Sequence, residues 1–129
     1  VIAIDTNLAV RYLTGDHPEQ SPRARALIDG AAVFVPVTVL LETEWVLRSV
    51  RGGATASVIE ALRAFGGLPT VTIEDGDSVA VALDLAAGGM DFADALHLSR
   101  TRHCEAFATF DRRLAKVARR AGYPAVRDA

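Results

Sequence analysis

Four carboxylate residues stand where acids from separate segments could act on one substrate. They are Asp5, Glu42, Asp94 and Asp111. Asp5 and Asp111 each close a short apolar run, whereas Glu42 and Asp94 lie within segments of helical periodicity. Clustered carboxylates repel one another unless protons or a cation intervene, and their oxygens suit Mg²⁺ or Mn²⁺. Such an ion lowers the pKa of bound water and offsets charge on a phosphoryl group, so the pattern indicates phosphodiester chemistry.

Taken singly, these acids also have a purely structural interpretation. Asp5 could cap the helix that follows it, and Asp91 is a natural N-cap for the helix that contains Asp94. An acid in the first turn of a helix complements the helix dipole by about 0.3–1 kcal/mol. Four acids predicted near one edge of one sheet are harder to explain in this way, because their mutual repulsion needs compensation.

Glu42 belongs to the predicted helix Thr38–Arg51. At about 100° per residue, the main apolar face of this helix contains Val39, Thr43, Val46, Leu47 and Val50. Glu42 falls at the edge of that face, where a carboxylate could look into a cleft, whereas Glu44 falls on the other flank and is expected to be solvated. Leu41 and Trp45 point nearly opposite, so the helix is expected to bury a second face against another helix or a partner.

Several other catalytic motifs are absent from the sequence. The only lysine, Lys116, follows no Gly-rich run, which excludes a P-loop, and neither G-x-G-x-x-G nor G-x-S-x-G occurs. Cys104 adjoins His103, but chain neighbours need not touch, and a small buried cysteine is the expected role. The histidines lack zinc-ligand spacing, although His97, three residues after Asp94, could orient that carboxylate.

The segments around these acids alternate between short apolar runs and amphipathic stretches. The predicted strands are Val1–Ile4, Val33–Pro36, Val71–Ile73, Ala106–Thr109 and Ala125–Val126. The predicted helices are Thr6–Thr14, Ser21–Asp29, Thr38–Arg51, Ala54–Phe65, Asp77–Ala87, Asp91–Arg102 and Asp111–Ala121. Ser21 and Thr38 are expected to cap two of these helices.

Short buried strands that alternate with helices indicate an α/β fold. We expect a parallel sheet of about four to five short strands, flanked by helices on both faces. Ligands bind such sheets beyond the carboxyl ends of the strands. Asp5 and Asp111 are placed at such ends, which makes that edge of the sheet the candidate site.

The composition predicts one soluble domain. The 129 residues are enough for one domain with its own core but too few for two. Half of them are hydrophobic and 23% are charged, which excludes a disordered chain. The longest run without a charge, Gly30–Leu41, has twelve residues, whereas a membrane span needs about 20, so no membrane association is expected. The single Cys104 cannot form an internal disulfide, which favours a reducing, cytoplasmic setting.

The formal net charge is -2, yet the charges are unevenly distributed. Residues 64–99 contain six acids and no lysine or arginine, whereas residues 100–120 contain seven basic residues and two acids. Thirteen of the fourteen basic residues are arginine, which suits bidentate contacts with phosphate. This distribution indicates either ordinary solvated helix faces or an acidic pocket bordered by a rim that attracts anions.

Four short motifs, in order along the chain, resemble those of a PIN domain. They are D-T-N at Asp5, L-L-E-T-E-W-V-L around Glu42, F-A-D-A-L-H around Asp94 and T-F-D at Asp111. Their order and spacing, and the length of the chain, look like the VapC-type toxins of bacterial toxin–antitoxin pairs. The resemblance covers nearly the whole chain and implies a single PIN domain over residues 1–129.

The resemblance implies a divalent-metal-dependent ribonuclease that uses Mg²⁺ or Mn²⁺. Its catalytic acids would be Asp5, Glu42, Asp94 and Asp111, with Asp5 and Asp94 as metal ligands. Glu42 and Asp111 would ligate the metal directly, act through water or orient the attacking water. The resemblance also implies an RNA substrate, a cognate antitoxin as partner and a homodimer.

Two alternatives stay open. One is a PIN nuclease that acts on structured RNA or single-stranded DNA outside toxin–antitoxin biology. The other is a phosphoacceptor receiver domain, which is also α/β and of similar length. That class needs paired acids after the first strand, an acceptor aspartate after a central strand and a late lysine. Here one acid ends the first strand, none follows Val33–Pro36, and Lys116 lies within a helix, so a receiver is disfavoured.

Overall fold

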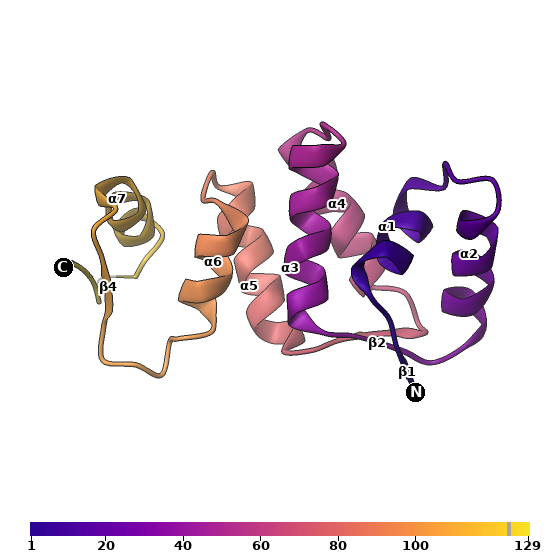
Figure 1. The fold of residues 1–129 in the computed structure, drawn as a ribbon. Helices are drawn as coiled ribbons and strands as arrows, with labels where there is room; N and C mark the ends of the chain where they lie inside the picture. Colours follow the sequence, from indigo (N-terminus) through magenta and orange to yellow (C-terminus); the bar gives the residue numbers. More distant parts are fainter. Residues whose placement is uncertain (124) are drawn as a thin grey trace. The chain divides into compact units, whose positions relative to one another are not determined.

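A computed structural model describes residues 1–123 and 125–129, and Figure 1 traces them from the N-terminus to the C-terminus. Over these residues the chain forms seven α-helices, one π-helical segment and five short strands, so the expected α/β class is confirmed. The chain divides into two compact units, Val1–Gly76 and Asp77–Ala129, each with its own sheet.

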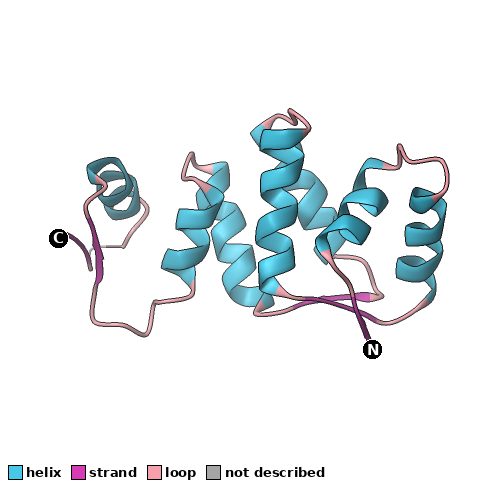
Figure 2. Ribbon diagram, viewed as in Figure 1, coloured by secondary structure: helices cyan, strands magenta, loops and turns pink. Residues whose placement is uncertain are grey.

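The first unit contains a three-stranded parallel sheet in the order β1-β2-β3, drawn in magenta in Figure 2. Its strands are β1 (Ile2–Ala3), β2 (Val33–Val35) and β3 (Val71–Ile73). In the register of the sheet, Val33 of the central strand lies between Ile2 and Val71. β1 is an edge strand of this sheet, and Ile2 is 46% exposed. The predicted burial of the first apolar run therefore holds only for Ile4.

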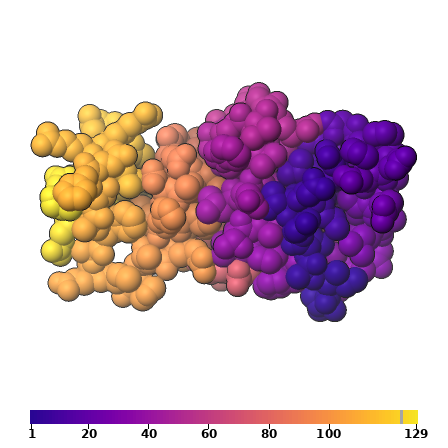
Figure 3. Space-filling model, in the orientation of Figure 1, coloured from indigo at the N-terminus to yellow at the C-terminus, as the bar shows by residue number. Residues whose placement is uncertain are grey.

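Helices connect the three strands of the first unit. They are α1 (Thr6–Thr14), α2 (Gln20–Gly30), α3 (Val37–Trp45), the π-helical segment η1 (Val46–Val50) and α4 (Thr55–Gly66). α1 and α2 lie between β1 and β2 in the chain, and the others lie between β2 and β3. Ile28, Leu40, Leu62 and Phe65 are fully buried and belong to the core of this unit. Figure 3 shows α1, in indigo, packed against its neighbours, and α1 contacts both α2 and α3.

Two helix starts in the first unit differ from the expected caps. Ser21 lies inside α2, and its hydroxyl donates to the Arg11 carbonyl at 2.8 Å. Thr38 does not cap α3, because this helix begins at Val37, whose N–H donates to the Glu74 carboxylate at 2.8 Å. At α3 a contact from a separate segment therefore takes the part of a local cap, whereas at α2 the Gln20 N–H donates to Nδ1 of nearby His17 at 2.9 Å.

The buried face of α3 and η1 is rotated by about one residue from the predicted apolar face. It contains Leu40, Thr43, Glu44 and Leu47, at i, i+3, i+4 and i+7 spacing. Glu44, which was expected to be solvated, is only 3% exposed, and its Oε2 lies 2.8 Å from Nε of Arg48. A charged side chain is tolerated on a packed face when it is paired in this way. Trp45 is 52% exposed, so the expected second buried face is uncovered at this residue.

The second unit contains helices and one parallel pair of strands. Its elements are α5 (Gly76–Ala87), α6 (Phe92–Ser99), β4 (Phe107–Thr109), α7 (Arg112–Arg120) and β5 (Val126–Asp128). β4 and β5 pair in parallel, with Phe107 beside Val126, and α7 connects them. The Ser78 hydroxyl of α5 donates to the Ser99 carbonyl of α6 at 3.5 Å, which links the two helices.

The five strands of the described residues are therefore joined by hydrogen bonds as two sheets, of three and two strands. Their number and their parallel direction agree with the expectation, but one continuous sheet was predicted. Each strand has only two or three residues, and each pairs with a strand of its own unit. Helices lie between the paired strands along the chain, as α7 lies between β4 and β5.

Two other expectations concern Cys104 and the crossing of a membrane. Cys104 was expected to be buried, but it is exposed in the turn between α6 and β4. Among the described helices, none has both the length and the apolar character that crossing a membrane requires.

Candidate active site

Asp5 follows β1 directly and caps α1. Its backbone is extended, with φ −95° and ψ 176°, and its Oδ1 accepts a hydrogen bond from the Leu8 N–H at 3.0 Å. The structural interpretation of this acid as a helix cap is therefore correct, but the cap uses only one of the two carboxylate oxygens. Within the described residues Oδ2 has no hydrogen-bond partner, and Asp5 is exposed, so this oxygen is available to a ligand.

Glu42 lies on α3, and a contact from α1 orients it. The hydroxyl of Thr6, the residue after Asp5, donates a hydrogen bond to Glu42 Oε1. Thr6 and Glu42 are 36 residues apart in the chain, and the packing of α1 on α3 brings them together. The structure thus links the first and second predicted acids through a single threonine.

Asp94 lies in the first turn of α6, in the second unit. Asp91 caps this helix, and its Oδ2 accepts a hydrogen bond from the Asp94 N–H at 3.3 Å. Burial raises the pKa of the Asp94 carboxyl above its ordinary value of 3.8, and the negative charge of Asp91 raises it further. The charge of His97 lowers this pKa, and that of Asp111 raises it. Asp94 therefore lies in an acidic setting that a bound cation would neutralise.

Asp111 follows β4 and caps α7. Its Oδ1 accepts a hydrogen bond from the Leu114 N–H at 3.0 Å, and its own N–H donates to Thr109 Oγ1 at 3.0 Å. Because the charge of Asp111 contributes to the raised pKa of Asp94, these two acids are close enough to interact.

The four predicted acids are thus arranged as two pairs, one in each unit. Asp5 and Glu42 form the pair of the first unit, and Asp94 and Asp111 form the pair of the second. Within the part of the chain that the structure describes, no set of three or more His, Cys, Asp or Glu side chains is close enough to hold a metal ion. Each pair by itself offers oxygen donors only.

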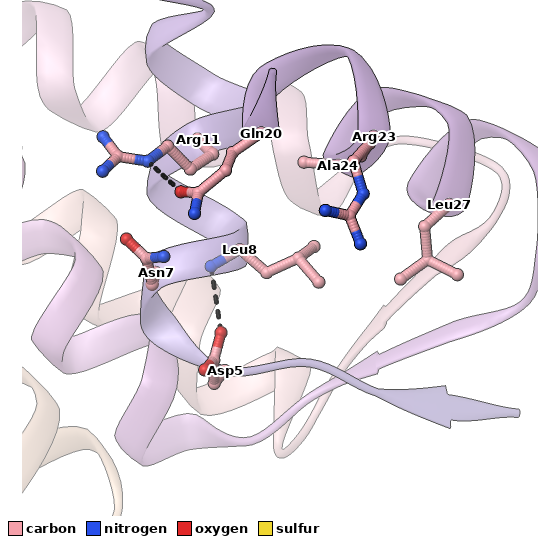
Figure 4. A pocket seen from close by; sticks show the side chains of 8 residues that line it. All are labelled: Asp5, Asn7, Leu8, Arg11, Gln20, Arg23, Ala24 and Leu27. Atoms are coloured by element: carbon pink, nitrogen blue, oxygen red, sulfur yellow. Dashed lines mark hydrogen bonds between the residues drawn. The ribbon is translucent and has the colours of Figure 1, made fainter. Parts of the chain in front are cut away.

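A cavity of about 380 Å³ opens beside Asp5, between α1 and α2 (Figure 4). α1 contributes Asn7 and Arg11 to its lining, and α2 contributes Gln20 and Arg23. A basic rim was expected within residues 100–120 instead, and these two arginines were not predicted to line a site. A signal for one of them was present, because Asn7 and Arg11 are four residues apart and share the face of a helix that begins after Asp5.

A comparison with protein families matches residues 2–120 to the PIN domain. The chain belongs to the PIN-domain family. The match includes residues of both units and all four acids of the pattern. PIN domains have a nuclease-type fold, are generally nucleases and typically bind divalent metals. A comparison with curated proteins found no match.

The donors of this PIN domain fit a hard divalent cation in their chemistry. Asp5, Glu42 and Asp111 each have one carboxylate oxygen occupied by a hydrogen bond from the chain. Oxygen donors from carboxylates are those that Mg²⁺ and Mn²⁺ prefer. The raised pKa of Asp94 adds an electrostatic reason, because a cation would favour the charged form that burial and its acidic neighbours disfavour.

Proposed function

We propose that this PIN domain is a divalent-metal-dependent endoribonuclease that hydrolyses RNA phosphodiesters. One observation carries the proposal above all: hydrogen bonds from the chain orient acids of the PIN pattern but leave one oxygen of each of these carboxylates without a partner in the described part of the chain. Asp5, Glu42 and Asp111 each use one oxygen for a hydrogen bond, and the other oxygen has no partner among the described residues. We propose that both units act together as a single PIN domain, which the match over residues 2–120 supports.

In this proposal Asp5 and Asp94 are ligands of Mg²⁺ or Mn²⁺, and Glu42 and Asp111 complete the acidic site. When bound, the ion lowers the pKa of a water molecule and offsets charge that develops on the phosphoryl group. The chain itself does the positioning. A backbone N–H of α1 orients Asp5, and the Thr6 hydroxyl orients Glu42.

Mapping of RNA 5′ ends after induction of the protein tests the nuclease. The wild type is expected to create new 5′ ends, and Asp5→Asn is expected to create none, because the substitution removes a metal-facing charge but little volume. Asp77→Asn changes an exposed acid in the first turn of α5 and is the matched control. Identical end maps for the wild type and Asp5→Asn would refute the proposal.

We also propose that the nuclease is the toxin of a toxin–antitoxin pair, with a small antitoxin protein as its partner. The order of the four motifs and the length of the chain support this role. Growth arrest on induction, relieved by coexpression of the antitoxin, is the expected behaviour. RNA cleavage without growth arrest would instead assign the protein to the PIN nuclease class outside toxin–antitoxin biology.

We propose a homodimer as the form in solution. The uncovered part of α3 supports an interface, because Trp45 is 52% exposed and Leu41, four residues earlier, is only partly buried. Exposed apolar side chains that adjoin one another often mark such interfaces. Light scattering is expected to give twice the chain mass of 13.7 kDa. A monomer at high micromolar concentration would contradict the dimer.

A further inference from the structure

The cavity between α1 and α2 has the size and the walls of a binding site. Its volume of about 380 Å³ falls within the range of roughly 300–1,000 Å³ that is usual for ligand pockets. The two helices that form it pack against each other, so its walls belong to regular structure rather than to loops. Leu8 and Leu27 supply apolar surface, and Asn7 and Gln20 supply amide groups (Figure 4).

Two arginines bring positive charge to this cavity. Arg11 Nε donates to Gln20 Oε1 at 2.8 Å, which holds the guanidinium, while its terminal nitrogens bond to no described residue. Arg23 forms neither a hydrogen bond nor an ion pair within the described residues, and it reaches from α2 into the space between the helices (Figure 4). Asp5 is the one acid in the lining, so positive charge is in excess there.

Arginines without carboxylate partners are well suited to phosphate. The planar guanidinium presents parallel N–H donors that match two phosphate oxygens. Asp5 belongs both to this cavity and to the proposed metal site, so the cavity begins where the cleaved phosphate would be held. An RNA strand that is cleaved beside Asp5 continues on at least one side of the cleaved bond. The negative charge of its next phosphate needs a cationic partner.

We propose that the cavity between α1 and α2, termed the Arg11–Arg23 pocket, binds a phosphate of the RNA strand adjacent to the phosphodiester that is cleaved. This inference rests on the proposed nuclease function. Arg23 contacts the oxygens of this phosphate. The guanidinium of Arg11 points away from Arg23 (Figure 4), so it contacts the strand beside that phosphate, and Gln20 is a positioning residue that acts through Arg11. The apolar wall of Leu8 and Leu27 lies against the sugar or base of the same nucleotide.

Nucleic acid suits this pocket better than an acidic protein segment. The substrate strand must already lie beside Asp5 for the proposed reaction, so it reaches the pocket without a second partner. The lining also combines arginines, amides and apolar surface, which match the phosphate, the base edges and the flat faces of a nucleotide. A carboxylate-rich peptide would use only the arginines.

Binding of RNA without cleavage tests the pocket. The background is the full chain with Asp94→Asn, in Mg²⁺, and the probe is a fluorescein-labelled single-stranded RNA. Arg23→Gln is expected to weaken binding about tenfold. It should also reduce the slope of log K against log salt by about 0.7, the value for one lost phosphate contact.

Two further variants make this measurement specific. Arg25→Gln removes the same charge from the same helix outside the pocket, and it should change the Kd by less than about twofold. Gln20→Ala removes no charge but releases Arg11, so it should weaken binding by about threefold with the salt slope unchanged. Circular dichroism confirms that each variant is folded.

Three results would overturn the pocket. Equal losses in Arg23→Gln and Arg25→Gln would show an effect of net charge alone. No loss of RNA binding in folded Arg23→Gln would show that the pocket takes no phosphate. If Arg23→Gln lost binding to a Glu-rich peptide but not to RNA, the pocket would belong to an acidic protein partner instead.

A change in the RNA identifies the phosphate. A methylphosphonate linkage has no charge, and next to the cleaved linkage it should lower kcat/KM of the wild type about tenfold. In Arg23→Gln it should cause little further loss, because both changes remove the same contact, whereas additive losses would refute the assignment. A separate result would refute the proposed nuclease function on which this inference rests. In that case the wild type does not cleave unmodified RNA with Mg²⁺ or Mn²⁺.

Discussion

The Thr6 hydroxyl donates its hydrogen bond to Glu42, so the residue that follows Asp5 also orients the second acid of the PIN pattern. This contact lies where α1 packs on α3. The start of α1 therefore orients two acids. Asp5 caps the helix with one carboxylate oxygen, and Thr6 donates a hydrogen bond to Glu42 on α3. The first unit can hold two acids side by side only if this packing is intact.

We expect Thr6→Val to lower kcat about tenfold, because valine keeps the shape of threonine but cannot donate to Glu42. Thr6→Ser retains the hydroxyl and should keep most of the activity. Rates on one RNA substrate at saturating Mn²⁺ measure the effect. Equal rates for the two variants would show that Glu42 needs no such orientation.

Asp5→Asn and Asp94→Asn should each abolish cleavage and leave the fold intact. Asparagine is also a good N-cap, so Asp5→Asn keeps an acceptor for the Leu8 N–H while it removes the charge. Asp111→Asn should be severe but partial. Cleavage rates and thermal unfolding measure the two effects, with Asp77→Asn as the control. Cleavage that persists in clean preparations of both key variants would place the site elsewhere.

Glu44→Gln tests the burial that the structure shows for this residue. Its carboxylate accepts from two guanidinium nitrogens of Arg48, at 2.8 and 3.3 Å. Loss of the charge should lower the free energy of unfolding by about 1–3 kcal/mol. Glu60→Gln, at an exposed position of α4, should change it by about 0.5 kcal/mol or less. Urea titration measures the free energy of unfolding of each protein. Equal stability of the wild type and Glu44→Gln would contradict the prediction and would mean that the ion pair only offsets the cost of desolvating its two charges.

The raised pKa of Asp94 predicts that stability without metal falls as the pH rises. Between the ordinary pKa of 3.8 and the raised pKa of the folded protein, the folded state binds more protons than the unfolded chain. The contribution of this group to the free energy of unfolding is therefore lost through that window. Asp94→Asn should flatten the fall, and Asp77→Asn should not. Urea unfolding in EDTA at several pH values above about 4 measures both slopes, and equal slopes for the wild type and Asp94→Asn would contradict the prediction.

Metal should reverse this loss of stability, because it binds the folded state. Mg²⁺ or Mn²⁺ at one hundred times its dissociation constant should add about 2.7 kcal/mol to the free energy of unfolding. Without metal, Asp94→Asn should be more stable than the wild type, and its response to metal should be weaker. Thermal unfolding of both proteins with EDTA and with Mn²⁺ compares them. A wild-type Tm that does not respond to Mn²⁺ would argue against a shared metal site.

Local features could be predicted from the sequence because they depend on neighbouring residues. The helix Thr6–Thr14 has both of its predicted bounds, since Asp5 caps its start and Gly15, with φ 66°, ends it in the left-handed conformation. Asp91 and Asp111 lie at the starts of α6 and α7 as expected. The order and type of the four acids were also sufficient to indicate the PIN family, which the match over residues 2–120 confirms. Their catalytic and metal-binding roles stay predictions.

Only the tertiary structure decided what happens between elements. The hydrophobic pattern of α3 predicted a buried face about one residue away from the observed one, and the pairing of Glu44 with Arg48 allowed a charge on the observed face. The cavity with Arg11 and Arg23 likewise requires two helices side by side, and Thr6 meets Glu42 only because α1 packs on α3. Capping and propensity act over a few residues of chain. The burial and pairing of charges depend on contacts that exist only once distant segments have packed.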